Sequence, residues 1–321
     1  MLEKITIFSN NLNNLDENKV GFTNYLRDIG CTVTICDVNT LCYKSGGFIA
    51  RGNEVRHELN LADGIPADIN VYLAEQDVIW LLNQPAPCFG VDAWSLLWAL
   101  NQKVPFVNAV ANTYLTNNKG FLAGILDEDS LIETVVSYDT DDHRQFAEEY
   151  NVSIIKPPSD GCGSRVFLVD PSGDNFGVIL QAMCGGSSGS HIHADTITGL
   201  NRTYAVSQKF IPGSEARVIL AGGKFIGGYA KTAPENDHRA NFAQGGGFLR
   251  TDFSESDRLR YGKIAQKLRN IGVNFCGLDV RDGKVLEFNL VDPGGLHTIK
   301  REFGEDLHGA AWDAIVESLC A

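Results

Sequence analysis

The alternation of apolar and polar positions predicts strands and helices that alternate along the first half of the chain. Apolar runs at 5–8 and 31–36 are typical of short buried strands. Between them, apolar side chains from Phe22 to Ile29 recur with helical spacing, and Gly30 follows where a helix-ending glycine is expected. Strand, helix and strand joined by short connections favour parallel pairing with a right-handed crossover. Further strands are predicted at 48–56, 70–73, 78–82 and 105–108, and a helix at 94–100.

From residue 151 onward the pattern changes to strand pairs with glycine-rich connections. A polar stretch at 117–120 comes before this change and marks a plausible domain start. We therefore predict an α/β fold with domains at 1–118, 119–205 and 206–321. The elements expected in the second half are strands at 152–156 and 166–169, hairpins around 221–223 and 281–283, and a helix at 254–271.

The composition narrows the class of protein. The 321 residues include 40 acidic and 27 basic side chains, and the net charge of −13 argues against nucleic acid or an anionic membrane as the main partner. The sequence has no apolar run of 18 residues and no basic start followed by a long apolar stretch, so we expect a cytoplasmic protein. The eight cysteines are scattered without a Cys-x-x-Cys pair, as reduced cytosolic thiols are. The chain has 33 glycines, more than usual, and the excess is concentrated at 161–189, 213–247 and 277–304.

The first candidate for chemistry is the loop that follows Lys156. Glycines at 161 and 163 allow backbone N–H groups to point inward around phosphate oxygens, so a loop of Gly161, Cys162, Gly163 and Ser164 could cover a nucleotide. The alternative is an ordinary tight turn. Lys156 closes an apolar strand, where burial without an anionic partner is costly, although an exposed strand end is equally compatible with the sequence.

The second candidate is a hairpin that brings three oxygen ligands together. Asp279 lies in the first strand, and Glu287 and Asn289 share one face of the second, a set that suits Mg²⁺. A two-residue turn at 282–283 would place Asp279 on the opposite face, whereas a three-residue loop at 281–283 would place all three on one face. The metal hypothesis therefore requires an odd-length connection. The alternative is the polar face of a half-exposed hairpin.

Other polar residues offer weaker signals. Arg217, Arg239 and Asn241 are candidates for holding a carboxylate or phosphate, because a guanidinium can make bidentate contacts. His191 and His193 could bind a metal, but in the Gly/Ser-rich segment 184–200 a solvated pair is the more economical interpretation.

The ordered series of motifs resembles the ATP-grasp ligases, and within them the bacterial glutathione synthetases, over nearly the whole chain. The segment 48–51 resembles part of that family's first domain, the stretch 108–119 carries a matching Lys119, and 155–163 resembles its phosphate-covering flap. Four further motifs follow in the family's order: Gln208–Ile211, Glu215–Val218, Arg239–Asn241 before Gly245–Gly247, and Gly277–Asn289.

The resemblance implies an ATP-grasp fold with a Rossmann-like N-terminal domain, a small lid subdomain and a C-terminal antiparallel-sheet subdomain. It implies ATP as co-substrate, Mg²⁺ with Mn²⁺ as an alternative, small-molecule substrates, and a homo-oligomer, dimer or tetramer. The residues that the resemblance implies for ATP binding are Lys119, Lys156, Gly161, Cys162, Gly163, Ser164, the adenine-binding backbone of Gln208, Lys209, Phe210 and Ile211, the ribose-binding acid Glu215, and Asn289. Metal binding is implied for Asp279, Glu287 and Asn289, and catalysis for Arg217 and Arg239. Substrate binding is implied for Arg217, Arg239, Asn241, Asp292, Gly294 and Gly295.

The same resemblance implies a reaction. The γ-phosphoryl group of ATP would pass to a substrate carboxylate, and an amine would displace phosphate from the acylphosphate to form an amide. Arg217 and Arg239 would stabilise charge during transfer, while glycine-rich lids would keep the acylphosphate from water.

Two departures from the family bear on the substrate. The segment 82–87 lacks an arginine that the family has there, and Asp292 stands where a hydroxyl residue is usual, which would disfavour an incoming carboxylate or favour an amine. The sequence is thus compatible with glutathione synthesis from γ-glutamylcysteine and glycine, with a related ligase for another acid or amine, and with a non-catalytic nucleotide-binding protein. The retained metal-binding oxygens argue against the last.

Overall fold

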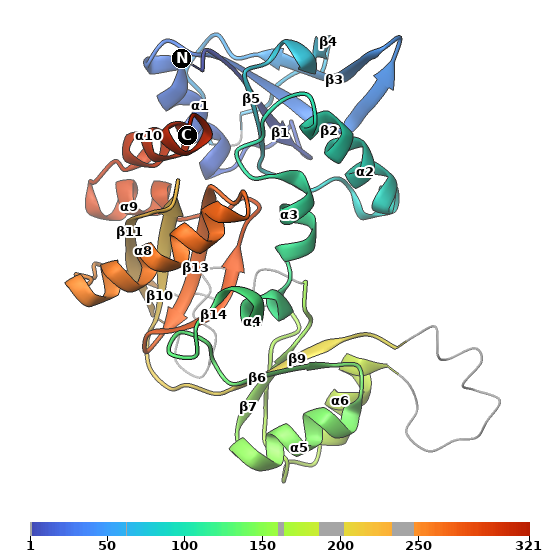
Figure 1. The fold of residues 1–321 in the computed structure, drawn as a ribbon, viewed down its shortest axis with the longest axis vertical. Helices are drawn as coiled ribbons and strands as arrows, with labels where there is room; N and C mark the ends of the chain where they lie inside the picture. The colour runs from blue at the N-terminus through green and yellow to red at the C-terminus, as the bar shows by residue number, and fades with distance from the viewer. Residues whose placement is uncertain (1, 62, 160–163, 186–201, 233–246) are drawn as a thin grey trace, which may run out of the picture.

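The described residues form three β-sheets with helices on their faces (Figure 1). The structure is a computed structural model, and it describes the chain except for residues 1, 62, 160–163, 186–201 and 233–246. The mixed α/β architecture agrees with the predicted fold class. The sheets lie in three parts of the molecule, with the small sheet at the bottom of Figure 1 set apart from the other two.

The first sheet has the strand order β4-β3-β2-β1-β5. Strand β1 pairs in parallel with β2, as predicted for strands joined through helix α1, and it also pairs in parallel with β5. Asp16 caps α1 by accepting a hydrogen bond from the backbone N of Lys19. The elements are β1 (Lys4–Ser9), α1 (Glu17–Asp28), β2 (Thr32–Lys44), β3 (Gly47–Glu54), β4 (Ile69–Tyr72), β5 (Val78–Leu81), α2 (Gly90–Asn101) and α3 (Val110–Thr116). The strand expected at 105–108 is replaced by two isolated bridges, a parallel one between Phe106 and Ile79 and an antiparallel one between Asn108 and Val273.

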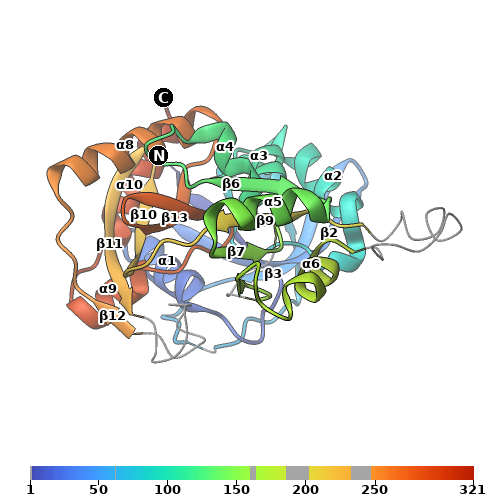
Figure 2. The same cartoon turned by 90° about the horizontal axis from the view of Figure 1, so that it is seen from below.

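The second sheet has the order β6-β9-β7-β8 and carries α5 and α6 (Figure 2). Its elements are α4 (Leu122–Ile125, which precedes it), β6 (Thr134–Ser137), α5 (Thr140–Tyr150), β7 (Ser153–Lys156), β8 (Phe167–Val169), α6 (Phe176–Cys184) and β9 (Ala205–Lys209). Because β9 pairs with both β6 and β7, the domain boundary predicted after residue 205 falls at the start of a strand of this sheet. We propose that the boundary follows Lys209.

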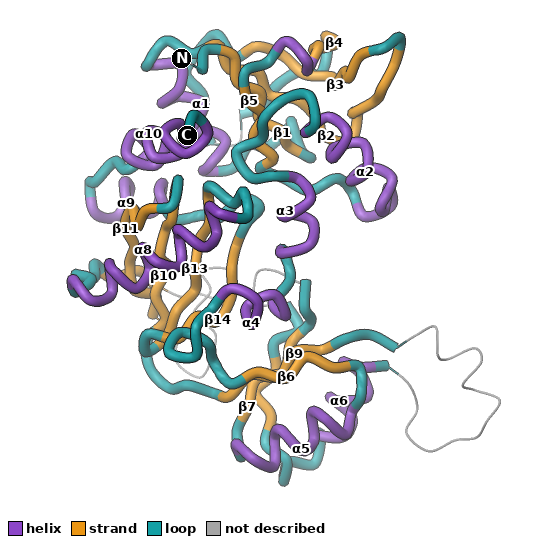
Figure 3. Tube along the Cα trace, viewed as in Figure 1, coloured by secondary structure: helices purple, strands orange, loops and turns teal. Residues whose placement is uncertain are grey.

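The third sheet is antiparallel, with the order β12-β11-β10-β13-β14 (Figure 3). Helix α8 begins with a capping box at Ser254 and packs on β10 and β11, while α10 packs on the same strands from the other side. The elements are β10 (Glu215–Ala221), β11 (Lys224–Thr232), β12 (Gly247–Leu249), α8 (Glu255–Asn270), β13 (Phe275–Arg281), β14 (Lys284–Asn289), α9 (Leu296–Phe303) and α10 (His308–Leu319).

One hydrophobic core joins the first and third sheets. The ring of Trp80 from β5 lies 5.2 Å from that of Phe275 in β13, and 4.3 Å from Phe22 of α1, measured between centroids. Buried Asn108 adds polar contacts at the same junction: its Oδ1 accepts from the backbone N of Asn274 and Phe275, and its Nδ2 donates to the carbonyls of Phe275 and Leu290. The ends of β1 and β5 are thereby held close to the end of β14.

Candidate active site

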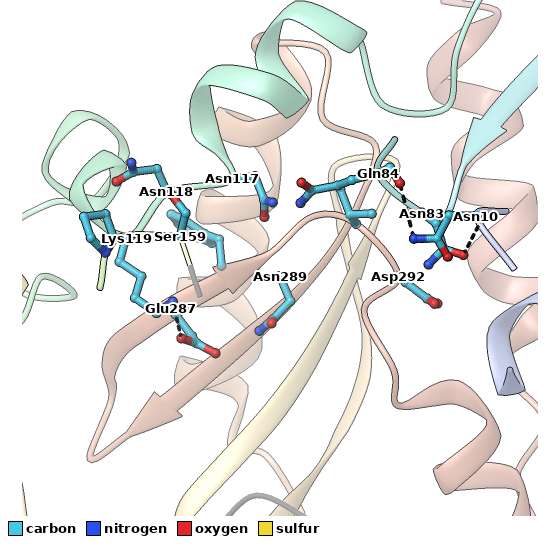
Figure 4. Close-up of a pocket in the computed structure, with 13 residues that line it drawn as sticks. Asn10, Asn83, Gln84, Asn117, Asn118, Lys119, Ser159, Glu287, Asn289 and Asp292 are labelled. Atoms are coloured by element: carbon cyan, nitrogen blue, oxygen red, sulfur yellow. Dashed lines mark hydrogen bonds and ion pairs between the residues drawn. The ribbon is translucent and has the colours of Figure 1, made fainter. Parts of the chain in front are cut away.

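A pocket of about 320 Å³ lies where the first sheet meets β14 and the segment before α4 (Figure 4). Amide side chains after β1 and β5 form one wall, and Lys119, Glu287 and Asn289 lie on the other side. Ligands of open α/β sheets bind at the carboxyl ends of the strands, which is where Asn10 and Asn83 lie. Asp292 lines the same pocket.

The two predicted phosphate-binding lysines both point inward. Lys119 starts a short 3₁₀ turn, and its buried side chain places Nζ 3.5 Å from Oε2 of Glu287. Lys156 ends β7, and its Nζ donates to the carbonyl of Leu286 at 3.2 Å. Lys156 is only 6 % exposed, so the alternative of a solvated strand end is wrong. Burial, together with the charge of Lys119, lowers the pKa of Lys156 to about 8, although Glu287 acts in the opposite direction.

The hairpin of β13 and β14 places the three predicted metal ligands on one face by a route that differs from the prediction. The connection is a two-residue turn in which Asp282 and Gly283 have φ of 49° and 73°, not a three-residue loop. A β-bulge at Leu286 then shifts the pairing by one residue, so that Asp279 pairs with Glu287 and Gly277 with Asn289. The extra residue that the metal hypothesis requires therefore lies within β14, at Leu286, and not in the connection between the strands. Asn289 Nδ2 is 3.2 Å from Oδ2 of Asp279.

Asp279 sits behind the pocket wall in a buried network of charged side chains. Arg217, its cross-strand neighbour, makes two hydrogen bonds to the carboxylate, Nε to Oδ1 at 2.7 Å and Nη2 to Oδ2 at 3.1 Å. Lys231 donates to the same Oδ1 at 2.6 Å. Burial acts to raise the pKa of Asp279, but the two cations overcome it and hold that pKa well below its usual range.

Glu215 lies in the same network and not on the pocket wall. Its carboxylate accepts from Lys231 Nζ at 2.7 Å and from Arg281 Nη2 at 3.4 Å. Burial and the charge of Asp279 raise the pKa of Glu215, although Lys231 and Arg281 act to lower it. Binding a ribose, the role implied by the resemblance, would require Glu215 to exchange a partner.

The residues expected to bind adenine lie at the end of β9. Gln208 Nε2 is 3.5 Å from the carbonyl of Leu286, and the backbone N–H groups of Lys209 and Phe210 donate to Glu133 and Val152. The carbonyl of Ile211 accepts from Arg281 Nη1 at 3.0 Å. This segment therefore approaches β14, and its adenine-binding role stays a prediction.

The loop after β14 carries the predicted substrate residues. Asp292 adopts a positive φ of 53° and Gly295 a φ of 149°. Arg217 Nη1 donates to the carbonyl of Gly294 at 2.8 Å, so one guanidinium links this loop to Asp279. Burial and the nearby Asp16 raise the pKa of Asp292 to about 7, against the effect of Lys19.

Several predictions fall outside the described residues. They are the flap glycines Gly161 and Gly163 with Cys162, the residues Arg239 and Asn241, and the pair His191 and His193. Ser164, the last residue of the predicted flap, is described and exposed.

Sequence reasoning missed two buried lysines. Lys231 is the penultimate residue of β11, and the signal that singled out Lys156, a lysine at the end of an apolar strand, applies to it equally. Lys19 is 1 % exposed in the first turn of α1, where nothing in the sequence marks it. Its partner Asp292 is 273 residues away, so only the fold reveals the contact.

The oxygen donors of the site fit a divalent cation in part. Glu287 and Asn289 line the pocket, and carboxylate and amide oxygens are ligands that Mg²⁺ accepts. Both oxygens of Asp279 are engaged by Arg217, so it would have to exchange a partner to act as a ligand. Within the described part of the chain, no group of three or more His, Cys, Asp or Glu side chains could hold a metal by itself. None of the described helices has the length and apolar character to cross a membrane.

Comparison with known proteins identifies the family. Residues 126–304 match the model of the prokaryotic glutathione synthetase ATP-grasp domain. A glutathione synthetase of Rhodopseudomonas palustris is 29% identical over 256 residues, covering 78% of this chain and 76% of that protein. One from Shewanella oneidensis is 28% identical over 274 residues, covering 82% and 79%.

The fold agrees with this relationship. The structure of the ATP-grasp ligase PsnB in complex with a minimal precursor superposes with a TM-score of 0.64 at 15% identity, covering 99% of this chain and 100% of PsnB. Membership of the glutathione synthetase family implies the use of ATP and a divalent metal with small-molecule substrates. The chain belongs to the prokaryotic glutathione synthetase family of ATP-grasp proteins, and it is an ATP-dependent, ADP-forming ligase.

Proposed function

We propose that this enzyme uses ATP and Mg²⁺ to join a carboxylate to an amine through an acylphosphate, with γ-glutamylcysteine and glycine as the first candidate substrates. We infer these candidate substrates from the relatives of this chain, which are named glutathione synthetases. A cytoplasmic location and assembly into a dimer or tetramer stay predictions from the sequence.

The observation that carries the proposal is a surplus of buried positive charge. Among the described residues, five cationic side chains and three carboxylates meet around β14, and most of them are buried, which is costly unless an anionic ligand completes the site. A nucleoside triphosphate has the negative charge needed to balance the surplus of cationic side chains. The cations are Lys119, Lys156, Arg217, Lys231 and Arg281, and the carboxylates are Glu215, Asp279 and Glu287.

In this proposal, different residues bind the phosphates, hold the metal and stabilise the developing charge. Lys119 and Lys156 would bind the phosphate oxygens, since both ammonium groups are held toward Glu287 and the bulge in β14. Glu287 and Asn289 would hold Mg²⁺, which neutralises phosphate charge during transfer. Arg217 lies between Asp279 and the loop after β14, where it would stabilise the charge that develops as the phosphoryl group moves.

The test is ADP release with each substrate omitted in turn. We expect release that depends on both γ-glutamylcysteine and glycine, and its loss in Lys156→Ala and Glu287→Ala. Nucleotide binding without ADP release, for any acid and amine tried, would instead support a non-catalytic nucleotide-binding protein.

The wall formed by the N-terminal domain favours a second candidate, a ligase for a different acid. The described residues of that wall are carboxamides, Asn10, Asn83 and Gln84, and include no arginine. Asn83 is fixed there because its Oδ1 accepts from Ser9 Oγ and the backbone N of Asn10. Carboxamides bind uncharged polar groups well but leave a remote carboxylate without a countercharge. Activity with acids that carry a single carboxylate, and none with γ-glutamylcysteine, would establish this alternative.

A further inference from the structure

The first turn of helix α1 contacts the loop that follows β14, although the two are far apart in the sequence. Lys19 Nζ contacts Asp16 and lies 3.1 Å from Oδ2 of Asp292, while Asn18 Nδ2 donates to Oδ1 of Asp292 at 2.6 Å. Both carboxylate oxygens of Asp292 are therefore bound by the first turn of α1. Lys19 and Asn18 are 1 % and 2 % exposed, so this contact is made away from solvent.

The same loop is held from the opposite side by Arg217. Its Nη1 donates to the carbonyl of Gly294, and its other two donors bind Asp279. The neighbouring Gly295 lies so close to the body of the sheet that an added Cβ would be 2.6 Å from Cδ1 of Ile219. The loop is thus fixed at Asp292 and at Gly294, two residues apart, by two different elements, α1 and β10.

The position of the loop matters because it contributes to the pocket. Val291 and Asp292 line the cavity beside the amide wall. A shift of this loop would change the shape of the cavity and remove the carbonyl that orients Arg217. A displacement of about 1 Å at a positioning group can cost about a hundredfold in rate.

We propose that Lys19 and Asn18 are positioning residues for the ligase reaction: through Asp292 they hold the 290–295 loop where it lines the substrate pocket and receives Arg217. The kinetic part of this inference rests on the proposed function, whereas the structural part does not. Loss of Lys19 removes the cation that Asp16 and Asp292 both contact and leaves Oδ2 of Asp292 without this partner, which favours displacement of the loop.

The control is available on the same helix turn. Glu17 precedes Asn18 and also pairs with the C-terminal part of the chain, through Arg301 Nη1 at 2.8 Å, but that pair is exposed and does not touch the loop. Glu17→Gln therefore removes a contact between the same two parts of the molecule without affecting Asp292.

The experiment compares Lys19→Met, Asn18→Ala and Glu17→Gln in the full-length enzyme. We expect Lys19→Met to raise the KM of the acid or amine at least tenfold while the KM of ATP changes less than threefold, Asn18→Ala to have a smaller effect in the same direction, and Lys19→Arg to restore most of the affinity. Glu17→Gln should match the parent. Wild-type kinetics in folded Lys19→Met or Asn18→Ala, or an equal rise in both KM values, would overturn the proposal.

Hydrogen–deuterium exchange separates this inference from the proposed function. Backbone amides of 290–295 should exchange at least fivefold faster in Asn18→Ala, and in Lys19→Met if it folds, than in Glu17→Gln. This readout needs no substrate, so it holds even if γ-glutamylcysteine and glycine prove to be the wrong pair. Unchanged exchange of this loop in Asn18→Ala would refute the positioning role.

Discussion

The Nζ of Lys156 donates to the backbone carbonyl of Leu286, the residue that bulges out of β14. The bulge thus has two effects: it turns Asp279 and Glu287 to the same face, and it presents a carbonyl to a buried ammonium. One irregular residue in β14 links Lys156, which is predicted to bind phosphate, to the hairpin that is predicted to bind the metal.

Nucleotide affinity should fall as the pH rises above about 8. Burial and Lys119 lower the pKa of Lys156 to about 8 in the free protein, and bound phosphate favours the charged amine. Binding must therefore take up a proton at higher pH, and it weakens as that proton becomes harder to supply. Calorimetric titration with ADP between pH 7 and 9.5, in buffers of different ionisation enthalpy, measures both the affinity and the number of protons taken up on binding.

Lys156→Met provides the comparison for this prediction. Its affinity should be about ten- to a hundredfold lower at pH 7, since a hydrogen bond to a charged group contributes about 1.5–3 kcal/mol, and its pH dependence should be flatter. A wild-type affinity that is constant across the range would show that Lys156 does not meet the phosphates.

Asp279→Asn should destabilise the fold strongly. Asp279 neutralises Arg217 and Lys231 in a buried setting, and removing one partner of such a network costs about 3–5 kcal/mol. The matched control is Glu317→Gln, which breaks an exposed pair with Lys224 and should leave the free energy of unfolding nearly unchanged. Urea denaturation of both variants without nucleotide decides the matter, and equal effects would contradict the network's structural role.

Glu287→Gln should act on metal use far more than on stability. The Glu287 side chain is 24% exposed and lines the pocket, so the neutral amide is tolerated, but the carboxylate proposed to bind the metal is lost. We expect the Mg²⁺ concentration for half-maximal ADP release to rise tenfold or more, with little change in the unfolding midpoint. An unchanged Mg²⁺ requirement would remove Glu287 from the metal site.

Two adjacent glycines should respond differently to alanine. Gly295 has a φ of 149°, and its added Cβ would meet Ile219, so Gly295→Ala should cost about 1–3 kcal/mol of folding free energy. Gly294 has nothing within 4 Å of an added Cβ, so Gly294→Ala should be nearly neutral. Denaturant unfolding of the pair tests whether the loop is as closely packed as described, and equal effects would argue that it is not.

Local patterns in the sequence predicted much of the fold. Apolar periodicity placed α1 and the strands around it, and a Gly-containing turn placed the hairpin of β13 and β14. The bulge at Leu286 was not predicted, because no residue type marks the extra position and only cross-strand packing fixes it. The contacts of Asp292 with Asn18 and Lys19 were missed for a related reason: polar residues in separate, distant segments carry no sign of each other.

The buried carboxamide of Asn108 has a consequence for exchanging parts between relatives. It satisfies four backbone groups at the ends of β13 and β14, yet it belongs to the amino-terminal portion of the chain. A chimaera that took residues 1–118 from a relative without asparagine at this place would leave those groups unsatisfied inside the junction. The choice of an N-terminal part for such a chimaera is therefore limited by a single side chain at the junction.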